Sequence, residues 1–151
     1  MFFVSVRRAE LASRDRASAD AQTATANRQG LRILVIDNEP EVLEATSGLL
    51  QRWGHQVQTA SSGLPAVQLL QSGSFDLALV DHQLDGDENG IDLVLNWRRI
   101  GCAPAAIVMV SADRNEAFLK AAAAARLPVL HKPVKPAALR AMIASVCQAV
   151  D

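Results

Sequence analysis

Residues 31–37 read Leu-Arg-Ile-Leu-Val-Ile-Asp, a short and almost continuous apolar run that ends in an acid. Proline at position 40 suits the first turn of a helix that begins soon after this run. Short continuous runs rich in β-branched residues are typical of strands that are buried on both faces. The run therefore predicts the first strand of a sheet that helices cover on both sides.

The rest of the chain repeats this pattern, because short apolar runs alternate with amphipathic stretches of about ten to fifteen residues. Such alternation indicates an α/β fold with a parallel, doubly wound sheet. The carboxyl ends of parallel strands meet at one edge of the sheet, where ligands bind. We expect strands over residues 31–37, 55–60, 75–81, 105–111 and 128–131, and helices over residues 42–53, 64–71, 91–100, 115–126 and 136–150.

Length and composition favour one folded domain. The chain has 151 residues, which is the size of a single domain with some spare length, and 50% of its residues are apolar. Residues 7–30 contain almost no large apolar side chain and cannot bury enough surface to offset their ordering entropy. We therefore expect an N-terminal segment and flexible linker over residues 1–30 and one domain over residues 31–150.

Charge and cysteine content exclude several classes of function. The formal net charge is −1, which disfavours nucleic-acid binding through a general positive field. Cys102 and Cys147 are too few for a disulfide framework or a cysteine zinc site, which favours a reducing, cytoplasmic location. Residues 1–6 lack the features of a signal peptide, and no apolar run reaches the roughly 18 residues of a membrane span. We expect neither nucleic acid nor membrane as a partner.

Polar side chains follow four of the five expected strands. Clustered carboxylates repel one another unless a cation joins them, and Mg²⁺ binds one or two carboxylates together with carbonyl oxygens and water. The expected convergence of these polar segments at one sheet edge favours a divalent-ion site. The simpler alternative is that Asp37 and Asp113 are helix caps and that Lys132 is solvated. The four segments are Asp37-Asn38-Glu39, Asp81, Ser111-Ala112-Asp113 and His131-Lys132-Pro133.

Taken in this order, the segments resemble the receiver domain of two-component response regulators. The resemblance covers about residues 31–150 and implies a flavodoxin-like fold of five βα units with strand order 2-1-3-4-5. In that family the Lys-Pro peptide bond is commonly cis. The motifs that carry the resemblance are the run 33–37, Asp81 after residues 76–80, Val110-Ser111-Ala112 and His131-Lys132-Pro133.

The resemblance also implies a role for each matching residue. Asp81 would take a phosphoryl group from a phosphohistidine of a histidine kinase or a histidine phosphotransfer protein. Asp37, Asp81 and the backbone carbonyl of Gln83 would hold Mg²⁺, while Lys132 and Ser111 would contact the phosphoryl oxygens. The domain would assist its own phosphorylation and dephosphorylation rather than act as a separate kinase. No effector domain fits after residue 150, so we expect signalling through contacts with a downstream protein.

Two positions depart from the family pattern. Receivers usually carry two adjacent acids after the first strand, and here Asn38 takes the second place. An amide oxygen can coordinate Mg²⁺ but adds no charge, and Glu39 is one position further on. The alternative is a pseudo-receiver that binds partners without phosphorylation. Val129 stands where receivers normally have Tyr or Phe, which excludes an aromatic switch at that position.

Other motifs carry less weight. Residues 85–90 match the start of a calcium-binding EF-hand loop, but Asp92 and Asn96 stand at its eighth and twelfth positions, so a solvated acidic loop is the better interpretation. His82 and His131 adjoin Asp81 and Lys132, but neighbours along a strand point to opposite faces, and we assign them no catalytic role. A small flavin-binding protein is disfavoured because no Ser/Thr/Gly-rich phosphate loop follows the first strand.

Residues 1–6, Met-Phe-Phe-Val-Ser-Val, alternate like a terminal strand. They resemble the last strand of a histidine-kinase ATP-binding domain, which precedes a linker. A polar linker and a receiver follow here, which is the order found at the C-terminus of hybrid sensor kinases. We therefore expect this chain to be, or to descend from, the receiver of a hybrid kinase. A floppy terminus is the alternative for these six residues.

Overall fold

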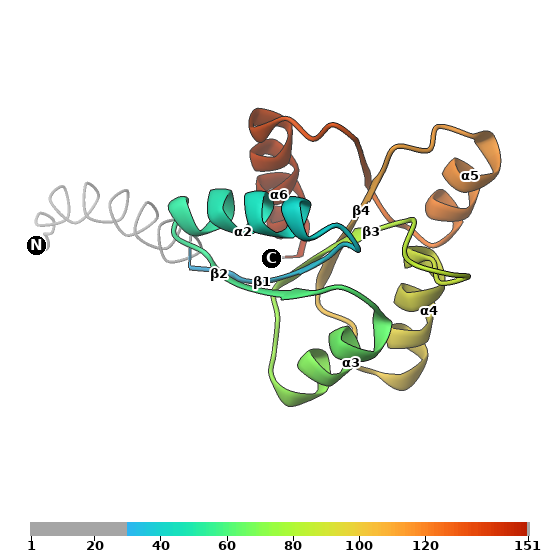
Figure 1. Ribbon diagram of the computed structural model, residues 1–151, viewed down its shortest axis with the longest axis horizontal. Helices are drawn as coiled ribbons and strands as arrows, with labels where there is room; N and C mark the ends of the chain where they lie inside the picture. The colour runs from blue at the N-terminus through green and yellow to red at the C-terminus, as the bar shows by residue number, and fades with distance from the viewer. Residues whose placement is uncertain (1–29, 151) are drawn as a thin grey trace, which may run out of the picture. The chain divides into compact units, whose positions relative to one another are not determined.

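The computed structural model describes residues 30–150 of the chain. The expected N-terminal strand and linker lie outside this part. The elements, labelled as in Figure 1, are β1 Arg32–Ile36, α2 Pro40–Arg52, β2 Gln56–Ala60, α3 Gly63–Ser72, β3 Leu77–Asp81, α4 Gly90–Ile100, β4 Ala106–Ser111, α5 Glu116–Ala124, β5 Val129–His131 and α6 Pro136–Val150.

The five strands form one parallel sheet in the order β2-β1-β3-β4-β5. This confirms the expected α/β fold with flavodoxin-like topology. The expected strands and helices all occur, and their ends differ from the expected ones by about one or two residues. Within residues 30–150, no helix has both the length and the apolarity to cross a membrane.

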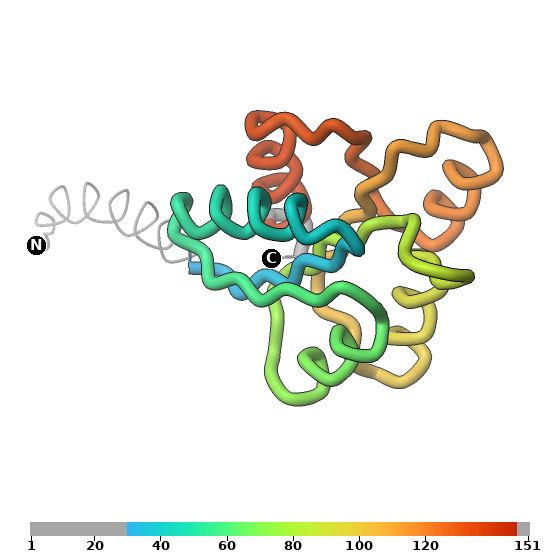
Figure 2. Tube along the Cα trace, in the orientation of Figure 1, coloured from blue at the N-terminus to red at the C-terminus, as the bar shows by residue number. Residues whose placement is uncertain are grey.

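Helices cover both faces of the sheet. Figure 2 places α2 and α6 on one face, opposite α3 and α4. Phe118 and Ala122 of α5 belong to the same buried cluster as α3 and α4, so α5 packs on that second face. The cluster also contains Trp97, which is completely buried, as the apolar spacing of its helix predicts.

The burial of the strands explains their sequences. All five residues of β3 are buried, and four of the five in β1 are, which accounts for their continuous apolar runs. The edge strand β2 is mostly exposed and correspondingly contains Gln and Thr. Central β3 therefore ends in a buried acid, Asp81, with neighbouring strands on both sides.

A glycine brings α4 close to this strand end. A Cβ atom at Gly90, the first residue of α4, would collide with the carbonyl oxygen of Asp81 and would lie 2.7 Å from Met109 Cε. The Gly90 N–H also donates to the carbonyl oxygen of His82 at 2.8 Å. Glycine at this position therefore allows the loop after β3 to fold directly over the carboxyl edge of the sheet.

Candidate functional site

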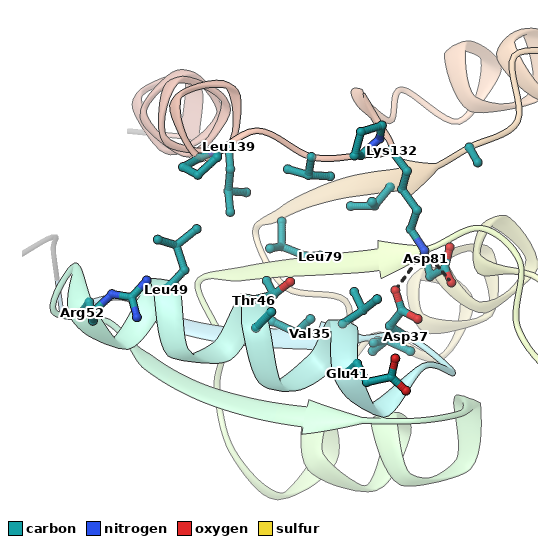
Figure 3. Close-up of a pocket in the computed structure, with 18 residues that line it drawn as sticks. Val35, Asp37, Glu41, Thr46, Leu49, Arg52, Leu79, Asp81, Lys132 and Leu139 are labelled. Carbon is teal, nitrogen blue, oxygen red and sulfur yellow. Dashed lines mark hydrogen bonds and ion pairs between the residues drawn. The ribbon is translucent and has the colours of Figure 1, made fainter.

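Lys132 lies beside the carboxylates of Asp37 and Asp81 at the carboxyl edge of the sheet (Figure 3). Its Nζ atom is 3.1 Å from Asp37 Oδ2, 3.4 Å from Asp81 Oδ2 and 3.8 Å from Glu39 Oε1. Asp37 and Asp81 are only 3% and 4% exposed. The topology thus brings together three residues that the sequence placed at the ends of β1, β3 and β5.

Burial and, to a smaller extent, the nearby charge of Asp37 together raise the pKa of Asp81 to about 6, even though Lys132 and a hydrogen bond from the Gln83 backbone act to lower it. The single ammonium group of Lys132 is therefore not enough to offset the desolvation of Asp81 and its repulsion by Asp37. Further positive charge at this place would stabilise the ionised form of Asp81. The donor set accordingly fits a divalent cation such as Mg²⁺.

Lys132 keeps its charge in this setting. Burial lowers the pKa of Lys132, but the hydrogen bond to Asp37 and the charges of Asp81 and Asp37 outweigh that effect, and the net shift is upward. The Lys132–Pro133 peptide bond is cis, the isomer that is common at this place in receivers. The site therefore contains a permanent cation directed at the two buried acids.

Ser111, the last residue of β4, forms hydrogen bonds both with the end of β5 and with the loop that leads into α5. Its side chain is 1% exposed, and its Oγ atom accepts a hydrogen bond from the Asp113 N–H at 2.9 Å. Its carbonyl oxygen accepts from the Lys132 N–H at 2.9 Å. The hydroxyl group retains its own proton, so it can also donate to an oxygen placed at the sheet edge.

Neither Asp37 nor Asp113 is a helix cap, so the simpler alternative for these two acids is wrong. The N-cap of α2 is Glu39, and that of α5 is Asn115, whose side chain accepts from the Phe118 N–H. Asp37 Oδ1 instead accepts from the Glu39 N–H at 2.9 Å, which holds the carboxylate at the sheet edge.

Of the other two expected metal ligands, Gln83 is part of the loop between β3 and α4, and Asn38 contacts that loop. The Nδ2 atom of Asn38 donates to Asp85 Oδ1 at 2.9 Å, and Gln83 pairs with Asn89 in an isolated antiparallel bridge. Their coordination of Mg²⁺ stays a prediction. The contact with Asp85 was not expected, since the sequence indicated only a solvated acidic loop there, and no local pattern links positions 38 and 85.

The buried acids open onto a groove of about 780 Å³ between α2 and α6. Figure 3 shows Asp37, Asp81 and Lys132 at one end of this groove and Arg52 at the other. Most of its lining is apolar, including Leu49 and Leu139. Among the described residues, no cluster of three or more His, Cys, Asp and Glu side chains could hold a metal, so an ion here would rely on two carboxylates, carbonyl oxygens and water.

His82 belongs to the packing behind the site. Its ring lies 4.2 Å from that of Phe118 between centroids, and its Nδ1 atom is buried without a hydrogen-bond partner. Burial lowers the pKa of His82, while the charges of Asp113 and Asp92 oppose that shift. This ring therefore joins β3 to α5, a contact that no sequence pattern indicated.

Comparison with known proteins agrees with this geometry. The AlgB alginate biosynthesis regulator of Pseudomonas aeruginosa is 33% identical over 116 residues, 77% of this chain and 25% of that protein. The chemotaxis protein CheY-3 of Vibrio cholerae is 29% identical over 74% of this chain and 88% of that protein. A receiver domain structure from Methanospirillum hungatei has a TM-score of 0.72 at 24% identity, covering 80% of this chain and 95% of that one.

The chain spans about a quarter of the length of AlgB, so the comparison with that protein concerns this domain only. The family model described as the response regulator receiver domain matches residues 33–144, most of the described part. By this match and the arrangement of Asp37, Asp81 and Lys132, the chain belongs to the response regulator receiver domain family.

Proposed function

We propose that this domain accepts a phosphoryl group on Asp81 from a phosphohistidine and passes the signal on through protein contacts. The donor would be a histidine kinase or a histidine phosphotransfer protein, as family membership implies. The observation that carries the proposal is the position of Lys132 Nζ, within 3.4 Å of both buried acids. A cation and two carboxylates at one sheet edge suit the transfer of an anionic group.

In the proposed step an Oδ atom of Asp81 attacks the phosphorus of the phosphohistidine. The phosphorus–nitrogen bond breaks, its electron pair returns to the imidazole, and Asp81 becomes an acyl phosphate. Lys132 would neutralise charge on the phosphoryl oxygens, and the Ser111 hydroxyl would donate to one of them. Because Ser111 also accepts from the Asp113 N–H, this new contact would alter the start of α5.

Receiver domains generally depend on Mg²⁺, and the two buried carboxylates here suit it. Asp37, Asp81, the Gln83 carbonyl oxygen and the Asn38 amide oxygen would hold the ion. When bound, it would offset the repulsion between the carboxylates and the incoming phosphoryl oxygens. Output would depend on β5 and the neighbouring helix α5 without an aromatic switch, since position 129 is valine.

Asn38 supports a second candidate, a pseudo-receiver that works as an interaction module without phosphorylation. This residue is a neutral amide where receivers carry an acid, and it already donates to Asp85. With one fewer carboxylate at the ion, Mg²⁺ affinity could fall below the level that phosphotransfer needs. The surface around α2 and α6 would still be available to a protein partner.

Intact-mass measurement after incubation with Mg²⁺ and acetyl phosphate distinguishes the two candidates. We expect a gain of about 80 Da, the mass of one phosphoryl group on a carboxylate, lost without Mg²⁺ and in Asp81→Ala. The matched control is Asp87→Ala, which removes an exposed aspartate of the adjoining loop. No gain, together with no Mg²⁺-dependent NMR shifts on addition of beryllofluoride, would support the pseudo-receiver instead.

We further propose that the domain derives from the C-terminal end of a hybrid sensor kinase. The support is the resemblance of residues 1–6 to the last strand of a kinase ATP-binding domain. Sequencing upstream of the first codon tests this, because an in-frame kinase core is expected there and an unrelated gene would contradict it. The cytoplasmic location, inferred from the two cysteines, stays a prediction.

A further inference from the structure

We propose that Asp85 supplies, through Asn38, the second negative charge of the Mg²⁺ pocket. This inference rests on the proposed Mg²⁺ site at Asp37 and Asp81. Asp85 would act as a positioning residue: it orients the Asn38 amide toward the ion and places a carboxylate directly behind that amide. The pair would thereby replace the second acid that Asn38 has displaced.

The chemistry of the contact fixes the orientation of Asn38. An ionised carboxylate only accepts hydrogen bonds, so the amide group must face Asp85 Oδ1 with its nitrogen, which lies 2.9 Å away. The Oδ1 atom of Asn38 is on the other side of the same planar group and is left to accept from water or to coordinate a cation. A hydrogen bond to a carboxylate also polarises the amide and increases the negative charge on that oxygen.

The loop between β3 and α4 holds Asp85 in this place. The Asp85 carbonyl oxygen accepts from the Glu88 N–H at 3.3 Å, and Glu88 Oε1 accepts from the Gly63 N–H at 3.0 Å. Leu84 beside it is 7% exposed and is part of the core. Asp85 itself is exposed, and these contacts of Leu84 and Glu88 hold the loop on either side of it.

Glu39 is the competing source of the missing charge, because it is the next acid along the chain. Its side chain is 61% exposed, and its Oε1 atom lies 3.8 Å from Lys132 Nζ. Glu39 thus neighbours the lysine, whereas Asp85 contacts the residue that replaces the acid. The geometry favours Asp85 as the partner of Asn38.

Asp85→Asn isolates the charge, because the new side chain can still accept the hydrogen bond from Asn38. We expect it to weaken Mg²⁺ binding about three- to tenfold, since a partly solvated charge near an ion has a modest effect. Asp87→Asn removes an exposed charge from the same loop and Glu39→Gln removes the competing acid, and both should change the affinity less.

The exchange of the two residues gives a stricter test. In the double variant Asn38→Asp with Asp85→Asn, the donor and acceptor change places while the total charge stays the same. We expect it to recover at least the original Mg²⁺ affinity. In the Asn38→Asp background alone, two carboxylates would face each other across about 3 Å and the free protein would lose stability.

The measurement is a Mg²⁺ titration of the full chain at constant ionic strength, by calorimetry and by NMR shifts of backbone amides near Asp37 and Asp81. Three results would overturn the inference. Asp85→Asn could weaken Mg²⁺ binding no more than Asp87→Asn does, or Glu39→Gln could weaken it more than Asp85→Asn does. The third such result is a Mg²⁺ affinity of the exchanged double variant that stays below the original one. If Mg²⁺ binds as expected but acetyl phosphate adds no mass, the inference stands and the proposed phosphotransfer fails. If acetyl phosphate adds the expected mass while Asp85→Asn leaves Mg²⁺ affinity unchanged, the proposed phosphotransfer stands and this inference fails.

Discussion

Lys132 Nζ lies 3.1 Å from Asp37 Oδ2, and this contact joins the end of β5 to the end of β1 across two intervening strands. The same ammonium group lies 3.4 Å from Asp81 Oδ2. In the absence of an ion, Lys132 is therefore the cation that offsets two buried carboxylates. Its removal should affect metal binding and phosphoryl transfer in opposite directions.

In Lys132→Met we expect Mg²⁺ to bind several-fold more tightly, because the ion no longer competes with an ammonium group for the same carboxylates. Phosphorylation by acetyl phosphate should slow by about tenfold or more, since the phosphoryl oxygens lose their cation. Calorimetric titration and timed intact-mass measurements check the two effects. The control is Lys135→Met, which removes an exposed lysine nearby; equal effects of both variants would contradict the prediction.

Asp81 should make the metal-free domain less stable as pH rises. Its pKa is about 6 in the folded protein against an ordinary value of 3.8, so the folded state holds the proton more tightly than the unfolded state. Stability is therefore lost between about pH 4 and pH 6 as the carboxylate ionises, and this loss is complete above that range.

Asp81→Asn should remove this penalty. We expect a gain of about 1–3 kcal/mol in the free energy of unfolding at pH 7 without Mg²⁺, and a much smaller difference near pH 4. Urea unfolding at the two pH values measures it, with Asp87→Asn as the exposed control. A gain that is equal at both pH values would mean that the ionised carboxylate is not its cause.

Ser111→Ala should separate phosphorylation from its structural response. It removes the acceptor of the Asp113 N–H and leaves that group unpaired at the start of the loop to α5, which should cost about 1–2 kcal/mol of stability. Mass gain with acetyl phosphate should persist, while NMR shifts in α5 on beryllofluoride addition should shrink. Ser111→Thr keeps the hydroxyl group, and a response as weak as that of the alanine variant would contradict this role.

Gly90→Ala should destabilise the domain by about 1–3 kcal/mol, because its Cβ atom would collide with the Asp81 carbonyl oxygen and crowd Met109 Cε. Gly48→Ala is the matched control. It lies within α2 with no atom within 4 Å of the added Cβ, so it should stabilise by about 0.5–1 kcal/mol through helix propensity. Thermal unfolding compares them, and a neutral Gly90→Ala would contradict the close approach.

Most of the fold could be predicted from local patterns in the sequence. Continuous apolar runs such as 33–37 and 77–80 mark buried strands because both faces of a parallel sheet are covered. Since such strands all end at one edge, Asp37, Asp81 and Lys132 could be expected to converge before any coordinates were known. The sequence by itself thus predicted the strand order, through its family resemblance, and the convergence of Asp37, Asp81 and Lys132.

Only the tertiary structure decided how these side chains pair. The Lys132 contact spans 95 positions and the Asn38 contact with Asp85 spans 47, and no periodicity in a sequence reports on such distances. The loop of residues 85–90 carries the composition of a solvated turn, and its contact with Asn38 arises because Glu88 and Gly90 fold it back over the sheet edge. Side-chain partners across loops depend on packing between separate elements, which is why local residue patterns could not predict them.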